Sequence, residues 1–364
     1  MKNNSPSTDI RYFGDAAAGY IDYDFHSGFN DEYSIPTRRI IRILSEDSRT
    51  SITKIASDLG LSRQTVKSRL GSIEKTLDVR YTLELNEKAL GILAPHIVVM
   101  EFAKKPDYDY ITRLLNKSYI PQLAFTIKGK NQMCIYAIAT SPTQYAYWNS
   151  TMSILLSRYG VNSYSSEIVH KQLGFVPLRN ELIERLDLDP NAKALIKMLN
   201  ENSRQTVHQL SKSLGRHFNT VTYTLGKLVK SGYVKRFTLT LSCQRRMVPA
   251  RFMIKYMVKE HREKDSSRAR RGITYDDPDS IVNRYIFNSS MVGSWDLFGM
   301  GVFDNYDIGY EHCALFYKQT MGRHIVKIDF DAIERVLVGR LPLRSIDVKK
   351  GYEALNWTED IEKL

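Results

Sequence analysis

Hydrophobic residues follow a helical period in some stretches of the chain and a strand-like alternation in others. In residues 35–90 they predict a helix opened by Pro36, a second helix over about 52–59 and a third that begins after Ser62. Gly60 ends the second helix, because glycine adopts the left-handed conformation of a tight helix end. The third helix carries one apolar stripe, formed by Val66, Leu70, Ile73 and Leu77. This stretch therefore predicts three helices with a short turn between the last two.

A strand-rich unit follows these helices. Residues 80–85 alternate like a strand or a wing. After them we expect strands at 95–103, 121–128, 132–140 and 162–170, with helices at 107–117 and 143–158. The β-α-β-β-α-β order is that of a ferredoxin-like domain.

The same succession occurs a second time. A shift of 155 residues places 41–80 on 196–235 with 13 identities in 40 positions, among them Ser48 on Ser203 and Gly60 on Gly215. Later strands are expected at 236–241, 250–259, 290–304 with an internal turn, and 324–330, with helices at 278–288 and 306–321. The predicted fold class is α+β, a tandem repeat of a winged three-helix helix-turn-helix domain and a ferredoxin-like domain.

The repeat divides the chain into five segments. Helix-turn-helix domains are expected at 35–90 and 188–248, and ferredoxin-like domains at 91–187 and 249–364. Residues 1–34 form an acidic, aromatic-rich tail that predicts partial disorder with some docking. An arginine-rich insertion at 261–277 predicts a mobile loop, either a solvated charge run or an arm that touches phosphate.

Composition narrows the class of protein. A chain of 364 residues with 43% hydrophobic and 25% charged residues is typical of a globular protein with more than one core. No apolar run is long enough for a membrane span, and the polar start lacks a signal-peptide core. Cys134, Cys243 and Cys313 lie far apart, which argues against disulfides and a cysteine zinc site. We expect a cytoplasmic protein without membrane partners.

The net charge of +12 is concentrated in the helical units. Residues 35–90 carry +4, and residues 188–248 carry eleven basic against two acidic side chains, which gives +9. The tail is acidic, and residues 249–364 are neutral. A spacer or dimerisation module has no need of this distribution, whereas a polyanion-binding module does.

Each helical unit has the pattern of a motif that enters the DNA major groove. Because the apolar stripe faces the core, the opposite face of the first recognition helix presents Ser62, Arg63, Gln64, Thr65, Lys67 and Ser68, with Arg69 at its edge. Arg and Lys reach guanine edges or phosphates, and Gln pairs bidentately with adenine. The second unit offers Arg216, His217, Phe218, Asn219, Thr220, Thr222, Tyr223, Lys227 and Lys230. Double-stranded DNA is the predicted partner.

Two segments resemble the Lrp/AsnC (feast/famine) family of transcription regulators. LSRQTVKSRL at 61–70 resembles the family's L-S-x-x-T-V-x-x-R-l recognition helix, and GSWDL at 293–297 resembles its G-x-Y-D-L segment. The resemblance covers nearly everything after residue 35, taken twice, and family members generally carry one copy. It implies a tandem fusion that acts as a covalent counterpart of a dimer.

The resemblance also implies a function. Such a chain is a sequence-specific regulator whose ferredoxin-like (RAM) domains hold a small effector, such as an amino acid, and assemble into homo-oligomers. The effector residues implied are Gly129, Gly293 and Asp296, although the first repeat keeps the glycine and lacks the acid. Asp296 either receives an ammonium group or caps a turn.

Two other functions stay open. Siroheme decarboxylases resemble this architecture, but His96, His170, His312 and His324 are scattered along the chain, and no hydrolase, metalloprotease, P-loop or dinucleotide motif occurs. We therefore predict no catalytic residue, no metal site and no cofactor. A DNA-packaging protein is the other alternative, and it would bind with little preference between sequences.

Overall fold

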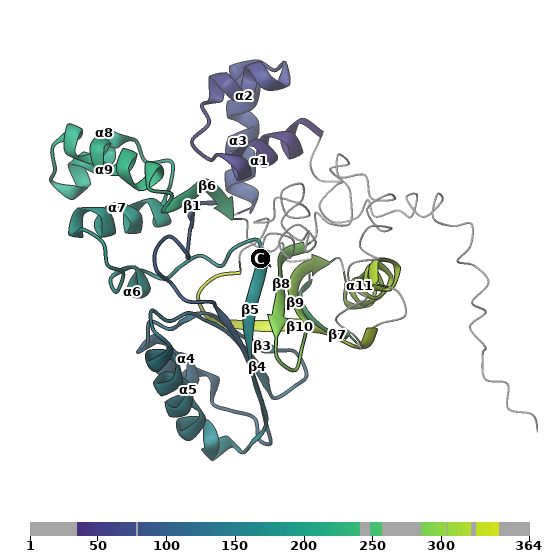
Figure 1. Ribbon diagram of the computed structural model, residues 1–364. Coiled ribbons are helices and arrows are strands. Elements are labelled where there is room, and N and C mark those ends of the chain that lie inside the picture. Colours follow the sequence, from purple (N-terminus) through teal and green to yellow (C-terminus); the bar gives the residue numbers. More distant parts are fainter. Residues whose placement is uncertain are drawn as a thin grey trace, which may run out of the picture.

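The computed structural model describes residues 35–77, 79–240, 248–256, 285–303, 305–321 and 325–341. Two helical units lie on one side of a strand-rich body (Figure 1). The acidic tail at 1–34 and the insertion at 261–277 lie outside the described residues.

The first helical unit contains α1 (Ile35–Glu46), α2 (Ile52–Leu59) and α3 (Arg63–Leu77). The Ser51 side chain caps α2 by accepting from the Lys54 amide, and Gly60 ends it with φ at 64°. Val66 and Ile73 of α3 are buried in the core, as the stripe predicts. Three helices with a tight turn between α2 and α3 are confirmed.

The second helical unit repeats this arrangement. After the short α6 (Asn180–Ile183) come α7 (Pro190–Glu201), α8 (Val207–Leu214) and α9 (Phe218–Lys230). Thr206 and Gln209 form a capping box at the start of α8, and Gly215 ends it with φ at 60°. The two units therefore use the same turn geometry.

One antiparallel ribbon joins the two helical units. It pairs β1 (Arg80–Leu85) with β6 (Val234–Thr240), and Thr82 lies opposite Thr238 at its centre. The predicted wings thus pair with each other. Each strand packs against a helix of the other repeat, since α7 contacts β1 and α1 contacts β6.

Contacts on the two sides of the ribbon mirror each other. The buried hydroxyls of Ser48 and Ser203 lie 2.7 Å apart, between residues separated by the repeat length. The Ser48 amide donates to the Phe237 carbonyl at 2.9 Å, and the Ser203 amide donates to the Tyr81 carbonyl at 3.0 Å. The two helical units are therefore related by a pseudo-two-fold axis within one chain.

Cation–π contacts follow the same symmetry. The Arg49 guanidinium lies 5.2 Å from the Phe237 ring centroid, and the Arg204 guanidinium lies 5.0 Å from the Tyr81 ring centroid. Each arginine stacks on an aromatic residue of the ribbon strand from the other repeat. Such contacts contribute about 0.5–2 kcal/mol, depending on how far they exclude water.

The body is a closed barrel of eight strands. The first repeat supplies β2 (His96–Phe102), β3 (Pro121–Ile127), β4 (Gln132–Ala137) and β5 (Val161–Leu173). The second supplies β7 (Val248–Tyr256), β8 (Tyr285–Val292), β9 (Leu297–Phe303) and β10 (Ile325–Val338). The order around the barrel is β10-β3-β4-β2-β5-β8-β9-β7. The tandem ferredoxin-like prediction is confirmed.

Long final strands close the barrel. The first part of β10 pairs with β7 of its own repeat, and residues Ile333–Val338 pair with β3 of the other repeat. In the same way β5 pairs first with β2, and its residues Ile168–Leu173 pair with β8. The expected strand 324–330 ends before the pairing with β3, which starts at Ile333, and the expected strand 162–170 includes only the beginning of the pairing with β8, which runs from Ile168 to Leu173.

Helices cover the outside of the barrel. α4 (Tyr108–Asn116) and α5 (Pro142–Leu156) bury Ile111, Leu115 and Trp148 in a core with residues of β2, β3 and β4. A single 3-10 turn (Ser157–Tyr159) follows α5. In the second repeat α11 (Tyr306–Met321) contacts β7, β9 and β10 (Figure 1).

The predicted helix at 278–288 is wrong over its last four residues, which belong to β8. Phe287 is fully buried, and β8 pairs with both β5 and β9. A short apolar run fits either a helix or a strand, and pairing on both edges of β8 decides for the strand. The predicted strand at 290–304 is two strands separated by a turn, and residues 278–284 lie outside the described part.

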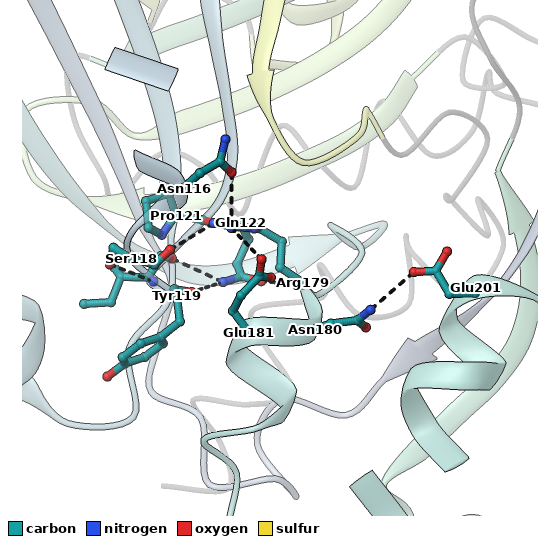
Figure 2. Close-up of polar contacts among 10 residues, drawn as sticks. Asn116, Ser118, Tyr119, Pro121, Gln122, Arg179, Asn180, Glu181 and Glu201 are labelled. Atoms are coloured by element: carbon teal, nitrogen blue, oxygen red, sulfur yellow. Dashed lines mark hydrogen bonds and ion pairs between the residues drawn. The ribbon is translucent and has the colours of Figure 1, made fainter. Parts of the chain in front are cut away.

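Arg179 anchors the connection from the barrel to the second helical unit (Figure 2). Its guanidinium donates to the carbonyls of Ser118, at 3.0 Å, and Pro121, at 2.9 Å. Its backbone amide donates at 2.7 Å to the side chain of Gln122, which is fully buried. These hydrogen bonds hold the segment that connects the barrel to the second helical unit against the start of β3.

Glu87 lies on the connection that leads from the first helical unit into the barrel, between β1 and β2. Its carboxylate accepts from the Tyr136 hydroxyl at 3.4 Å and from the Gln172 amide at 3.5 Å, both on barrel strands. Burial raises the pKa of Glu87 to about 7, an effect that nearby Lys235 partly offsets.

The Glu87 side chain should make stability depend on pH. Its folded pKa lies above the unfolded value of about 4.3, so the free energy of unfolding should fall as pH rises from about 4 to about 7. We expect Glu87→Gln to stabilise the protein at pH 8 by about 1–3 kcal/mol and to change little at pH 4. Urea unfolding at both values measures this, with exposed Glu101→Gln as control. Equal effects of Glu87→Gln at the two values would contradict the expectation.

Candidate nucleic-acid interface

The first recognition helix presents an exposed polar face. Ser62, Arg63, Gln64, Lys67 and Ser68 are exposed on or just before α3. The Ser62 hydroxyl accepts from the Thr65 amide at 3.0 Å and lies 2.8 Å from the Thr65 hydroxyl. Ser62 and Thr65 therefore fix the start of the helix, and within the described residues no hydrogen bond or ion pair engages the side chains of Arg63, Gln64 or Lys67.

Arg69 points to a neighbouring helix. Its guanidinium donates to the Thr37 hydroxyl of α1 at 2.9 Å, and the side chain is partly buried. This contact connects α3 to α1. Arg69 therefore lies at the margin of the exposed face, as the sequence predicts.

The second recognition helix presents a different face. His217 caps α9, and its Nδ1 accepts from the Asn219 amide at 3.3 Å. Behind it Phe218 is 48% exposed and Tyr223 is 73% exposed, unusually open positions for aromatic rings. Asn219, Thr220 and Thr222 are exposed between them.

Basic residues flank α9 at both ends. Arg216 precedes the helix, and its Nε donates to the Asn191 amide oxygen at 3.0 Å. Lys227 and Lys230 lie exposed in the last turn. The structure therefore brings the predicted residues of the second unit together around one helix, with aromatic and amide groups near its start and cations at its ends.

The predicted effector residues lie at different seams of the barrel. Gly129 lies in the β3–β4 turn, where the neighbouring Lys128 amide donates to the Ala332 carbonyl of β10 at 2.9 Å. Gly293 and Asp296 lie in the β8–β9 turn next to β5. The structure thus brings Gly293 and Asp296 together and leaves Gly129 at the opposite seam.

The β8–β9 turn packs on a buried carboxylate. The Ser294 amide donates to Glu167 of β5 at 2.7 Å, and Glu167 is only 1% exposed. A Cβ at Gly293 would lie 1.6 Å from the Glu167 carboxylate, so only glycine permits this approach. The backbone of Asp296 closes the turn, since its amide donates to Ile254 and its carbonyl accepts from Met291.

Sequence reasoning missed the charged cluster at the other seam. Arg251 of β7 is buried, and its Nη2 lies 2.6 Å from Asp331 of β10. Lys130, in the β3–β4 turn, lies 2.5 Å from the second oxygen of Asp331, and Gln132 accepts from Arg251. The available signal was a single arginine inside the apolar strand PARFMIKY.

The histidines considered for a cofactor are dispersed. His96 stacks on Tyr145 with ring centroids 3.7 Å apart, and burial lowers the pKa of His96. His170 is exposed on β5, while His324 and the side chain of His312 lie outside the described part. Among the residues described, no three His, Cys, Asp or Glu side chains are grouped to hold a metal. No helix in the same part of the chain is long and apolar enough to cross a membrane.

These features define a tandem helix-turn-helix protein with an internally paired barrel. Residues 38–72 match the AsnC-type helix-turn-helix domain, and residues 180–235 match the winged helix-turn-helix DNA-binding model. Two HTH-type transcriptional regulators named LrpA, from Pyrococcus horikoshii and Pyrococcus abyssi, are each 31% identical over 85 residues, covering 23% of this chain and 60% of theirs. The chain thus spans about three fifths of the length of these relatives. The resemblance to the Lrp/AsnC family is confirmed.

The whole fold has a solved counterpart. The siroheme decarboxylase NirDL matches with a TM-score of 0.54 and 9% identity over 90% of this chain and 98% of its own. Its complex with an iron-uroporphyrin III analogue matches with the same score. At this identity the likeness concerns the fold, and it confirms the tandem architecture over nearly the full length.

The buried cluster yields a test of the barrel. Asp331→Ala would leave Arg251 buried without its carboxylate, so we expect the free energy of unfolding to fall by about 3–5 kcal/mol. Asp329→Ala is the matched control on the same strand, because Asp329 pairs with the exposed Lys327 at 3.1 Å. That change should cost under about 1 kcal/mol. Urea unfolding measures both free energies. If Asp331→Ala lowered the free energy of unfolding no more than about 1 kcal/mol, like the control, the buried pair would not be a structural requirement.

Proposed function

We propose that this chain is a sequence-specific DNA-binding transcriptional regulator of the Lrp/AsnC type. The observation that carries the proposal is a pair of helix-turn-helix units joined by one ribbon, each with an exposed recognition helix. The exposed side chains of Arg63, Gln64 and Asn219 have the donor and acceptor groups that read base edges in the major groove. A regulator reads sequence with such groups and holds phosphate with the surrounding cations.

Charge favours DNA over a purely structural role for the helical units. The strongest positive charge, +9, belongs to residues 188–248, and Lys212, Arg216, Lys227 and Lys230 are exposed there. A packaging protein would share this basic surface. A regulator differs by retaining roughly a thousandfold or greater preference for its site over random DNA.

The barrel chemistry favours a regulator over a tetrapyrrole enzyme. A tetrapyrrole with many carboxylates needs cationic side chains in its pocket. The seams described here bury the carboxylates of Glu167 and Asp331, and the buried Arg251 is already paired with Asp331. Adding the tetrapyrrole to purified protein and recording absorbance tests this alternative, and a strong Soret-type band would favour the enzyme.

We also propose that a small effector, such as an amino acid, acts at the turn that contains Gly293 and Asp296. The buried Glu167 carboxylate next to this turn supplies negative charge for an ammonium group. Because the barrel closes within one chain, homo-oligomers would form through its outer surface. Effector binding would then alter how neighbouring pairs of helix-turn-helix units are spaced.

The DNA-reading assignment predicts two separable classes of variant. Arg63→Ala with Gln64→Ala should reduce the preference for the protein's own promoter region over random DNA. Replacing Lys212, Arg216, Lys227 and Lys230 by alanine should weaken binding to all sequences and flatten the dependence of affinity on salt. Fluorescence anisotropy with both duplexes over a salt series separates the two effects.

A control outside the proposed interface tests for a general effect of net charge. Lys104 and Lys105 are exposed in the barrel region, away from both recognition helices, and their replacement by alanine should leave binding nearly unchanged. If the Arg63/Gln64 variant and the quadruple lysine and arginine variant both bound the promoter region like the wild type, the assignment of the interface would be wrong.

A further inference from the structure

The two recognition helices occupy equivalent positions but carry different residues at the reading positions. The shift of 155 residues that relates the repeats pairs Arg63 with Phe218, Gln64 with Asn219, Lys67 with Thr222 and Ser68 with Tyr223. All eight side chains are exposed. The comparison is therefore between two open surfaces of the same geometry.

One reading position is shared in its chemistry. Gln64 and Asn219 both end in a carboxamide, which donates to one atom and accepts from another. This pattern matches the N7 acceptor and N6 donor of adenine in the major groove. An adenine is thus the base that the two helices have in common.

The other positions differ in kind. Arg63 and Lys67 give α3 two cations with no partner in the described structure, which suit the O6 and N7 acceptors of guanine. At the same positions α9 has Phe218, 48% exposed, and Thr222. Tyr223 adds a second ring that is 73% exposed. Phenylalanine and the threonine methyl suit the methyl group of thymine, the apolar feature of the major groove.

The internal symmetry fixes how these two helices are combined. A homodimer presents the same recognition helix twice and so reads a palindrome. Here the ribbon and the buried Ser48–Ser203 contact join two unlike helices within one chain. Every bound chain therefore carries one helix of each kind, and a second chain is not needed to form the pair.

We infer that one chain reads a non-palindromic DNA site with two unlike halves. The half under α3 contains adenine next to G·C pairs, and the half under α9 contains adenine next to thymine-rich positions. This inference rests on the proposed function and specifies the class of DNA that it requires.

Selection from a random pool of duplexes by the full chain tests the inference. The enriched motif should have two dissimilar halves of the stated base types. Phe218→Ala with Tyr223→Ala should relax preference in the thymine-rich half alone, by about fivefold or more at the affected positions. Arg63→Ala should act on the other half alone. Tyr147→Ala, at an aromatic residue 77% exposed on α5, is the matched control and should leave the motif unchanged.

A gain-of-symmetry variant makes the test sharper. Phe218→Arg with Thr222→Lys copies the α3 residues onto α9 at exposed positions, and it should turn the selected motif into a near-palindrome. A palindromic motif selected by the wild-type chain would overturn the inference. Relaxed base preference in both halves of the motif in the Phe218/Tyr223 variant would overturn it too. In either case the wild-type chain would still read DNA, so the proposed function would stand. No enrichment over random DNA would overturn the proposed function as well.

Discussion

The ribbon of β1 and β6, with the Ser48–Ser203 contact beside it, is the constraint on which the placement of both recognition helices depends. Both hydroxyls are fully buried, and the Ser203 hydroxyl also donates to the Thr238 carbonyl at 3.4 Å. Removing Ser203 would leave the Ser48 hydroxyl without its partner, at a cost of about 1–3 kcal/mol. Arg49 and Arg204 then clamp each helical unit onto the aromatic residue of the opposite strand. A two-fold pair that separate chains would form by association is thereby built into one chain.

The barrel applies the same principle a second time. The extended ends of β5 and β10 reach across to the other repeat and close two seams. In a dimer of identical chains the two seams would have the same residues. Here both repeats belong to one chain, so the residues of the two seams can differ. One seam contains Lys130, Asp331 and Arg251 as a charged cluster, whereas the other contains a Glu167 carboxylate that receives the Ser294 amide. The recognition helices also differ, with Arg63 on α3 and Phe218 on α9 at equivalent positions.

The sequence predicted those features that depend on local chemistry. Gly60 and Gly215 end helices in the left-handed conformation, and the stripe around Val66 places Arg63 and Gln64 on the outer face. Features that depend on long-range pairing were beyond it. Phe287 lies in a run that fits a helix as well as a strand, and only its neighbours β5 and β9 make it a strand. The partnership of Arg251 with Asp331, 80 residues later, likewise requires the barrel to be known.

The central claim is that the internally paired form of the two helical units is the form that reads DNA. It is tested most directly by the DNA affinity of a Ser48→Cys, Ser203→Cys chain, measured oxidised and reduced, with the cross-link located by mass spectrometry. The two hydroxyl oxygens lie 2.7 Å apart, close enough for the sulfur atoms to meet. The account predicts an intramolecular disulfide in the monomer and equal affinity in both states. Cross-links only between chains, or loss of DNA binding on oxidation, would contradict it.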